Sequence, residues 1–496
     1  MRSWSVPSST APWRRMLVFG LAALALSAAT VACAPPETPP SMVIIVIDTL
    51  RADHLGLYGY VSNPTSPNLD ERAATAAVFE RAHSTAPWTL PSFGSMFTGQ
   101  LPTRHSAGVR VGDYEAAVEA GEDDDIVVRP NKTLYRLDDQ LPTLAATLQT
   151  AGYRTAAIMN NSFLTTEFGL NRGFETYDFD PRTPERTATE ATDLALDWLR
   201  RYDDSPDPQP FLLVVHYFDP HLPYDAPAPY LGRFAGRYES DQFRLPMPDT
   251  DWLRYNIRQR VDGWQELMAM EQALYDEEIA YTDSEVERLL AALDERGFGE
   301  RGYVLLTSDH GEEFHDHGGS EHGHTVYEEL IRVPMLVWGP GVRPGGYQLP
   351  VSLLDIMPTL LDIADVPAPA ELPGASLWPA LREGPASRTA SAIRFDRPLI
   401  AEGMLYGDEK KALIRWPWKL MVDIQDEGQW LYDLASDPKE ENPAALDNLD
   451  DAGRDRLLTM MAELQATMEA SATTHGERAS LSESTLERLR ALGYIR

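Results

Sequence analysis

Carboxylate and imidazole side chains follow two short apolar runs of this chain. Asp48 comes directly after the run 42–47, and Asp309 and His310 come shortly after the run 303–306. Two further apolar runs end in polar residues in the same way, at Asn160, Asn161, Asp219 and His221. Any one of these residues could cap a helix or close a turn. Taken together, carboxylates and histidines at strand ends favour an enzyme with a metal site at Asp48, Asp309 and His310.

More histidines follow His310 at short spacing. They are His315, His317, His322 and His324. A solvent-exposed loop rich in histidine would give the same pattern. Beside two strand-end carboxylates, metal ligation is the favoured interpretation.

A hydroxyl-rich turn, residues 86–99, lies between the two runs in sequence. Thr89 is followed closely by Pro91 and Ser92, and a hydroxyl residue near a proline is typical of the first turn of a helix. Backbone N–H groups at a helix start attract anions, so this turn offers both a nucleophile and an anion-binding backbone. A purely structural cap is the alternative role for Thr89.

The elements that would position these residues alternate along the chain. Apolar runs at 155–159, 211–217 and 333–338 suit strands that are covered on both faces of a sheet. Apolar residues at helical spacing occur at 141–148 and 286–293. This order predicts an α/β fold with a doubly wound, mostly parallel central sheet flanked by helices. Polar ligands of such sheets collect at the carboxyl ends of the strands.

Composition narrows the possible partners. The chain has 496 residues, 43% of them hydrophobic, which is enough to bury a large core. Its formal net charge of −33 makes nucleic acid or an anionic membrane surface an unfavourable partner. It has one cysteine, Cys33, so an intrachain disulfide is excluded.

The N-terminus has the pattern of an export signal. Residues 1–33 carry Arg14 and Arg15, then an apolar stretch, then small residues up to Cys33. The residues before Cys33 are similar to a bacterial lipoprotein cleavage site, which predicts a lipid anchor on Cys33 and a place in the cell envelope, facing the periplasm or the exterior. An ordinary cleaved signal with an incidental cysteine is the alternative. Residues 34–40 are proline-rich and predict an extended tether.

Short motifs run through the rest of the chain in a fixed order. They are VIDTLRAD at 46–53, PS at 91–92, TG at 98–99, HYFDPHLPY at 216–224, SDHGE at 308–312, YEELIRVP at 327–334, DIMPT at 355–359 and LYDL at 431–434. In this order the chain resembles the sulfatase family of the alkaline phosphatase superfamily from about residue 42 to about residue 442. The resemblance implies an alkaline-phosphatase-like fold with a small C-terminal subdomain, and a metal-dependent hydrolase of sulfate-type or phosphate-type esters.

The signature turn departs from the sulfatase pattern. Sulfatases have a Cys or Ser that is oxidised to formylglycine, followed four residues later by an arginine, whereas this chain has Thr89 and Phe93. Threonine carries a methyl group on Cβ, so formylglycine cannot form at Thr89. Related phosphatases, phosphodiesterases and phosphoglycerol or phosphoethanolamine transferases use an unmodified Thr or Ser at this place. The departure therefore favours a Thr89 nucleophile and phosphate-type esters.

The resemblance also implies a site around Thr89. It assigns a divalent metal to Asp48, Thr89, Asp309 and His310, and His310, standing where many sulfatases have an asparagine around calcium, favours zinc or manganese over calcium. It gives His221 a catalytic, substrate-contacting role. His324 falls one residue out of register with the substrate lysine of sulfatases, with His322 as a competitor, and Asn160 is expected among the substrate-binding residues. Either His322 or His324 could instead hold a second metal, together with Asp219.

The expected domains are a catalytic domain over 41–395, a small antiparallel sheet over 396–450 and a helical tail over 451–496. An aromatic and proline-containing insertion at 226–262 is either a substrate-selecting lid or a packed subdomain.

The overall expectation is an exported hydrolase of a small ester, an envelope glycan or a lipid headgroup, in contact with the membrane only through its lipid anchor. Hydrolysis is preferred over transfer because the sequence predicts no membrane-spanning bundle that could present a lipid donor. A phosphoglycerol or phosphoethanolamine transferase is the first alternative. A catalytically silent envelope-binding protein is the alternative from another class.

Overall fold

A computed structural model describes residues 1, 39–109, 133–180, 185–206, 209–238, 250–386, 397–471, 476–491 and 494. The chain divides into two units between Pro39 and Pro40, and the second unit holds all the elements below. The predicted signal, the lipidation site Cys33 and nearly all of the tether lie outside the described residues. Among the helices that are described, none is both long enough and apolar enough to cross a bilayer.

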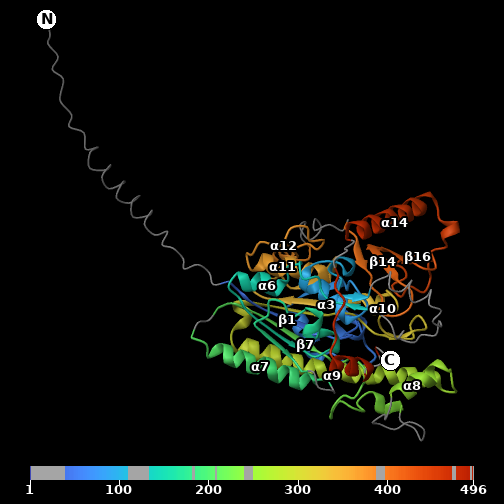
Figure 1. The fold of residues 1–496 in the computed structure, drawn as a ribbon, viewed down its shortest axis with the longest axis horizontal. Coiled ribbons are helices and arrows are strands. Elements are labelled where there is room, and N and C mark those ends of the chain that lie inside the picture. The colour runs from blue at the N-terminus through green and yellow to red at the C-terminus, as the bar shows by residue number, and fades with distance from the viewer. Residues whose placement is uncertain are drawn as a thin grey trace. The chain divides into compact units, whose positions relative to one another are not determined.

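A central sheet of eight strands forms the core of this unit (Figure 1). In spatial order the strands are β12 (Gly345–Ser352), β2 (Ala77–His83), β11 (Arg332–Trp338), β8 (Gly302–Ser308), β1 (Ser41–Ile47), β7 (Phe211–Tyr217), β5 (Arg154–Met159) and β6 (Thr176–Phe179). The pairings make seven strands parallel to one another and only β11 antiparallel. The prediction of a mostly parallel α/β sheet is therefore confirmed.

The apolar run at 333–338 forms a strand as predicted, but its direction is reversed. The chain leaves β8 at its carboxyl end, passes through β9 (Glu313–Phe314), β10 (Ser320–Glu321) and α10 (Glu328–Ile331), and re-enters the sheet as β11 beside β8. A parallel neighbour would need a crossover to the opposite end of the sheet, whereas a connection that stays at one end reverses the strand.

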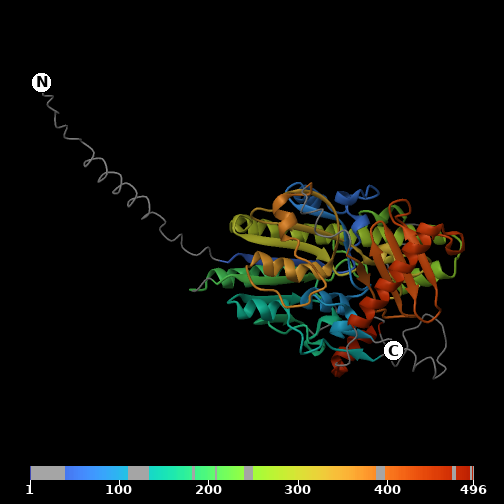
Figure 2. The same cartoon turned by 90° about the horizontal axis from the view of Figure 1, so that it is seen from above.

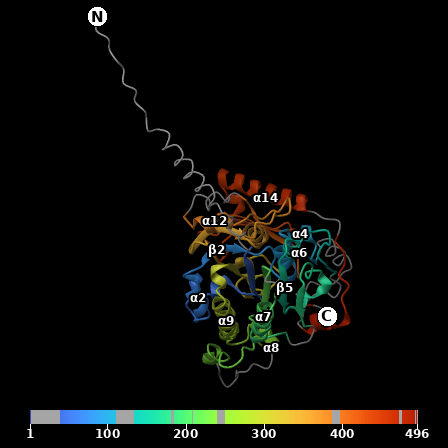
Figure 3. The same ribbon diagram turned by 90° about the vertical axis from the view of Figure 1, so that its left-hand side faces the viewer.

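Helices cover both faces of the sheet because alternate residues of each strand point to opposite sides. In β1, Met42 and Val46 pack with helices of one face, and Val43 and Ile47 pack with helices of the other. The first face carries α3 (Thr89–Thr98), α6 (Leu144–Thr150), α11 (Ile356–Ile363) and α12 (Trp378–Glu383). The second carries α2 (Pro67–Ala73), α7 (Ala188–Asp203), α8 (Thr250–Arg258) and the long α9 (Trp264–Glu295). Figure 3 shows the two groups of helices on opposite sides of the strands.

A second, smaller sheet follows in the C-terminal part of the chain. Its four antiparallel strands are β13 (Leu399–Ala401), β14 (Lys410–Arg415), β15 (Trp418–Asp423) and β16 (Gln429–Asp433). Helix α14 (Asp451–Ser471) packs Met460 and Leu464 against this small sheet. Figure 2 shows the helix in red beside the orange strands. The predicted small C-terminal sheet is confirmed.

The tail after α14 returns to the central sheet. Helix α15 (Glu483–Ala491) buries Leu489 in the core of the α3 face. Ala479 N–H donates to the carbonyl of Leu134, in the short strand β4 (Leu134–Tyr135), which pairs with β3 (Gly108–Val109). Of the insertion at 226–262, residues 226–238 and 250–262 are described, and its role as a lid or subdomain stays a prediction.

Candidate active site

Strand register brings the first two candidate ligands together. Ile47 of β1 lies opposite Ser308 of β8, so the residues that follow, Asp48 and Asp309, meet at the same end of the sheet. Thr49 then turns with φ +55°, a left-handed conformation that is uncommon for threonine, and its N–H donates to Asp309 Oδ1 at 3.3 Å. Unusual backbone of this kind is concentrated at functional sites.

His310 points its free nitrogen at both carboxylates. Its Nδ1 lies 2.9 Å from the carbonyl oxygen of Gly311, which fixes Nδ1 as the protonated nitrogen of a neutral ring. The unprotonated Nε2 then lies 3.5 Å from Asp48 Oδ1 and 3.4 Å from Asp309 Oδ2. Two carboxylates and one imidazole nitrogen converge here, which is the arrangement that a bound cation completes.

The site is fully enclosed. Asp48, Asp309 and His310 are all 0% exposed. Among the described residues, the ion-pair partners of the two aspartates are histidines only, and Asp48 Oδ1 and Asp309 Oδ2 have no hydrogen-bond donor. Burial and the neighbouring Asp48 raise the pKa of Asp309 well above its usual range. Such orphaned buried oxygens fit a divalent metal, and these three residues form a group whose ligand atoms could hold one.

Thr89 joins the same cluster as the first residue of α3. Trp88, in extended conformation, takes the N-cap position before it. Thr89 Oγ1 lies 3.3 Å from His310 Nε2 and accepts a 3.2 Å hydrogen bond from Asn161 Nδ2. The hydroxyl therefore faces the metal-ligand group rather than capping the helix that it opens.

Phe93 occupies the next turn of α3, where the sulfatase pattern has its arginine. It is completely buried, and its ring lies 5.2 Å from the His216 ring in an edge-on arrangement. His216 Nε2 in turn lies 3.4 Å from Asp48 Oδ2. An apolar ring packed on the His216 imidazole thus stands where the sulfatase pattern has an arginine.

The two asparagines after β5 differ in their contacts. Asn161 Nδ2 donates to Asp48 Oδ2 at 2.7 Å and to Thr89, and its Oδ1 accepts from Phe163 N–H. Asn160 Nδ2 donates to the carbonyl of His216. Asn161 is the one that touches the nucleophile candidate, while the substrate-binding role of Asn160 stays a prediction.

The remaining predicted histidines separate into two groups. His322 lies beside His310, with ring centroids 4.5 Å apart and ring planes tilted by 42°, and the ring centroid of His221 lies 5.1 Å from that of His322. His324 instead pairs with Glu313 through Nε2 at 2.8 Å, a contact that raises the pKa of its ring against the effect of burial. The structure thus brings His221 and His322 to the metal-ligand group, and the catalytic role of His324 stays a prediction.

Four residues of this site were missed by the sequence analysis as site residues: Asn161 in its contact role, His216, Glu312 and Tyr494. His216 lies near the end of β7, the neighbour of β1, and Asn161 follows β5, the next strand of the sheet, so the strand-end pattern could have included them. Glu312 Oε1 lies 3.1 Å from His322 Nδ1. Tyr494 comes from the C-terminal tail, and nothing in its sequence surroundings indicates the site.

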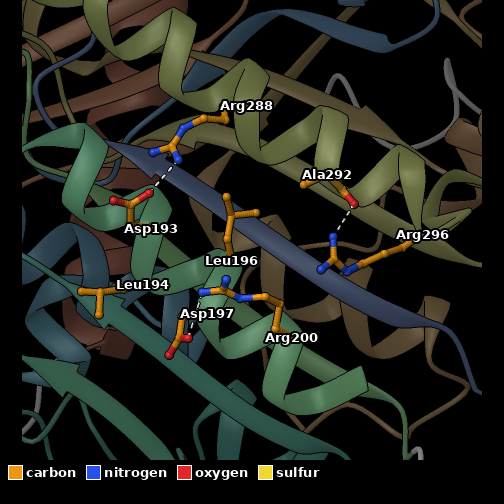
Figure 4. Close-up of a pocket in the computed structure, with 8 residues that line it drawn as sticks. All are labelled: Asp193, Leu194, Leu196, Asp197, Arg200, Arg288, Ala292 and Arg296. Carbon is orange, nitrogen blue, oxygen red and sulfur yellow. Dashed lines mark hydrogen bonds and ion pairs between the residues drawn. The ribbon is translucent and has the colours of Figure 1, made fainter. Parts of the chain in front are cut away.

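A groove elsewhere on the surface does not resemble this site. It lies between α7 and α9. Figure 4 shows that each of the three arginines lining this groove has an acidic or a backbone partner. Arg288 pairs with Asp193 at 2.6 Å, Arg200 pairs with Asp197 at 3.0 Å, and Arg296 donates to a carbonyl of its own helix. These guanidinium groups are already satisfied, so the groove offers paired charges rather than a built anion site.

Comparison with known proteins decides the family. The family model described as Sulfatase matches residues 40–366, and the model for the C-terminal part of N-sulphoglucosamine sulphohydrolase matches residues 319–469. The chain belongs to the sulfatase family. It is therefore a hydrolase of sulfuric or phosphoric esters, and the predicted family is confirmed.

Individual relatives have low sequence identity to this chain, but the similarity extends over most of the length of both chains. A Delta 4,5-hexuronate-2-O-sulfatase of Bacteroides thetaiotaomicron is 24% identical, covering 84% of this chain and 86% of the relative. A choline-sulfatase of Rhizobium meliloti is 26% identical, covering 82% and 83%. The crystal structure of a phosphonate monoester hydrolase of Agrobacterium radiobacter shares the fold with a TM-score of 0.63 and 18% identity, over 90% of this chain and 98% of that one.

Proposed function

We propose that this sulfatase-family enzyme hydrolyses phosphate-type esters with unmodified Thr89 as its nucleophile. The observation that carries the proposal is the position of the Thr89 hydroxyl, 3.3 Å from His310 Nε2 and inside the group formed with Asp48 and Asp309. A hydroxyl at a helix start, next to backbone N–H groups, is also well placed for an anionic substrate.

Asp48, Asp309 and His310, with Thr89 as a further ligand, are the residues that would hold the metal. Two carboxylates, an imidazole and a hydroxyl favour zinc or manganese, with calcium as the alternative. When bound, a divalent ion would favour the deprotonated form of the Thr89 hydroxyl and stabilise negative charge on the transferred group. Asn161, which donates to both Asp48 and Thr89, would keep the hydroxyl in a fixed orientation.

The chemistry of the covalent ester favours phosphorus over sulfur. Attack by Thr89 Oγ1 would form a bond to the central atom and break the bond between that atom and the leaving oxygen. The proton of the Thr89 hydroxyl passes to water and the leaving oxygen takes a proton from water, while His221 and His322 are the residues proposed to contact the transferred group or the leaving oxygen. With phosphorus, water can attack the Thr89 ester in a second in-line step and release the threonine hydroxyl with inorganic phosphate. A sulfated threonine lacks the elimination route that a formylglycine hydrate provides. The fold shared with a phosphonate monoester hydrolase is compatible with this choice.

The cell envelope is the proposed location, with Cys33 as the lipid-bearing residue. The support is the sequence pattern of residues 1–33 and the proline-rich segment that follows it. The proposed substrate is a small ester, an envelope glycan or a lipid headgroup. A relative named for 2-O-sulfated hexuronate is consistent with a sugar-containing substrate.

Turnover of three matched aryl esters tests the proposal. Full-length protein supplied with Zn²⁺ or Mn²⁺ is assayed on an aryl sulfate, an aryl phosphate monoester and an aryl phosphodiester, beside Thr89→Val and Thr89→Ser. Thr89→Val preserves shape but removes the hydroxyl, so a loss on the order of a thousandfold or more is expected, while Thr89→Ser keeps measurable activity. Ordinary turnover by Thr89→Val contradicts the nucleophile, and hydrolysis of the sulfate alone contradicts the substrate class. If none of the three esters is turned over, an envelope-binding role is favoured.

A further inference from the structure

The two site histidines have a shared partner that comes from the C-terminal tail. Tyr494 Oη lies 2.5 Å from His221 Nε2 and 3.4 Å from His322 Nε2. The tyrosine is 3% exposed, and its ring packs edge-on against Phe163 at 4.7 Å. Phe163 in turn contacts Trp88, the residue before Thr89, at 5.1 Å.

Hydrogen bonding explains why this hydroxyl matters to both rings. His221 Nδ1 lies 2.7 Å from the carbonyl of Leu222, which makes Nδ1 the donor and Nε2 an acceptor in the neutral ring. The Tyr494 O–H donates to that Nε2, and its oxygen keeps lone pairs that can accept from His322. His322 Nδ1 is held by Glu312 at 3.1 Å. Each ring is therefore fixed at both nitrogens, one of them by the same phenol.

The tail that delivers Tyr494 is firmly docked. Arg488 of α15, itself 4% exposed, pairs with Glu185 at 2.8 Å and donates to the carbonyl of Asp180 at 2.7 Å. Leu489 is fully buried, and Tyr494 N–H donates to its carbonyl. A buried ion pair and a buried leucine make this segment a built part of the site, rather than a strand of chain that rests on it.

We infer that Tyr494 is a positioning residue of the esterase site, whose hydroxyl fixes the orientation of the His221 and His322 rings. The inference rests on the proposed function of the two histidines. It adds a contribution from a residue 273 positions away from His221 in the chain. Because the contact is a single hydroxyl, its removal should change the chemical step more than substrate binding.

Tyr494→Phe is the decisive variant, since it removes the hydroxyl and keeps the ring on Phe163. Tyr347→Phe is the matched control, because Tyr347 is also fully buried and its hydroxyl donates to the backbone of Arg343, in another part of the core. For Tyr494→Phe, kcat should fall by about tenfold or more with little change in KM. Tyr347→Phe should leave these kinetic constants unchanged.

A measurement without turnover separates this inference from the proposed nucleophile. In histidine-labelled protein, Tyr494→Phe should shift the ring ¹⁵N signals of His221 and His322, assigned by His→Gln variants, and Tyr347→Phe should not. Unchanged histidine signals, or a kcat/KM that rises because the phenol had obstructed the substrate, would overturn the inference. If Thr89→Val stays active while Tyr494→Phe shifts the signals and lowers kcat, the nucleophile assignment fails and Tyr494 keeps its role.

Discussion

Two of the buried carboxylate clusters among the described residues differ in what supplies the positive charge. In the active site, Asp48 and Asp309 have only histidines as ion-pair partners among the described residues. In the second cluster, Lys419 of β15 is 0% exposed and pairs with Glu328 at 3.0 Å and with Glu440 at 2.8 Å. We call this second group the lysine cluster.

The lysine cluster connects the small sheet to the large one. Glu328 of α10 also lies 3.1 Å from His83 of β2, and its N–H donates to Glu440 at 2.7 Å. Burial alone would raise the pKa of Glu328, but Lys419 and His83 lower it below its usual range. Where the chain supplies its own cation, the buried carboxylates hold elements together. In the Asp48 and Asp309 cluster, the described residues supply no lysine or arginine, and Asp48 Oδ1 and Asp309 Oδ2 are left without a hydrogen-bond donor, which fits a metal site.

Asp309→Asn should have the largest effect, because it removes a ligand from the cluster without its own cation. We expect loss of bound Zn²⁺ or Mn²⁺, an activity loss on the order of a thousandfold, and loss of the thermal stabilisation that the metal confers, about 3 kcal/mol at a hundredfold excess over Kd. In the metal-free state the variant should be at least as stable as wild type, since a carboxylate next to Asp48 is gone.

Metal content and calorimetry with and without chelator test this. Asp355→Asn is the control, because Asp355 is fully buried but paired with Arg397. This variant protein should lose stability and keep its bound metal. Unchanged metal content in Asp309→Asn would place the metal elsewhere.

Lys419→Met tests the other half of the comparison. It would leave Glu328 and Glu440 buried without their cation, at an expected cost of about 3–5 kcal/mol in the free energy of unfolding. Lys410→Met, at a lysine whose side chain is 22% exposed and pairs with Asp423 at 3.2 Å, should cost about 1 kcal/mol or less. Urea unfolding at pH 7 measures both. Equal losses in the free energy of unfolding for the two variants would show that the buried lysine cluster contributes no more to stability than an exposed ion pair.

A smaller effect is expected from His317, at the edge of the lysine cluster. Burial opposes its charge, but the partner Glu329 at 2.7 Å raises the pKa of His317 to about 9. Between pH 6.5 and 9 the folded protein keeps a proton that the unfolded chain releases, so stability should be full below pH 6.5 and fall as the pH rises through 9. Since water reaches part of the ring, we expect about 1–2 kcal/mol.

Unfolding of wild type and His317→Gln across pH 6 to 10 checks this sign. The variant should show a flatter dependence in that window. A variant curve parallel to that of wild type would show that the pair with Glu329 does not control this part of the pH dependence.

The sequence predicts the part of this site that follows from strand periodicity. Apolar runs that end on Asp48 and Asp309 become adjacent parallel strands, and parallel strands bring their ends to one edge. The direction of β11 was not predictable, because an apolar run does not say at which end the chain enters the sheet. Two neighbouring asparagines cannot be distinguished by spacing alone, and Asn161 is the one in contact with Thr89. The role of Tyr494 could not be predicted from sequence patterns, because its position depends on how helix α15 packs against the rest of the fold.

The most direct test of the central claim is mass spectrometry of the peptide containing Thr89, after acid quench of the metal-loaded enzyme during turnover of an aryl phosphate ester. The account predicts an unmodified threonine before substrate is added and a phosphoryl group on Thr89 in the quenched sample, absent from Thr89→Val. Undiminished turnover with Thr89 unlabelled, or the phosphoryl group on another residue, would contradict it.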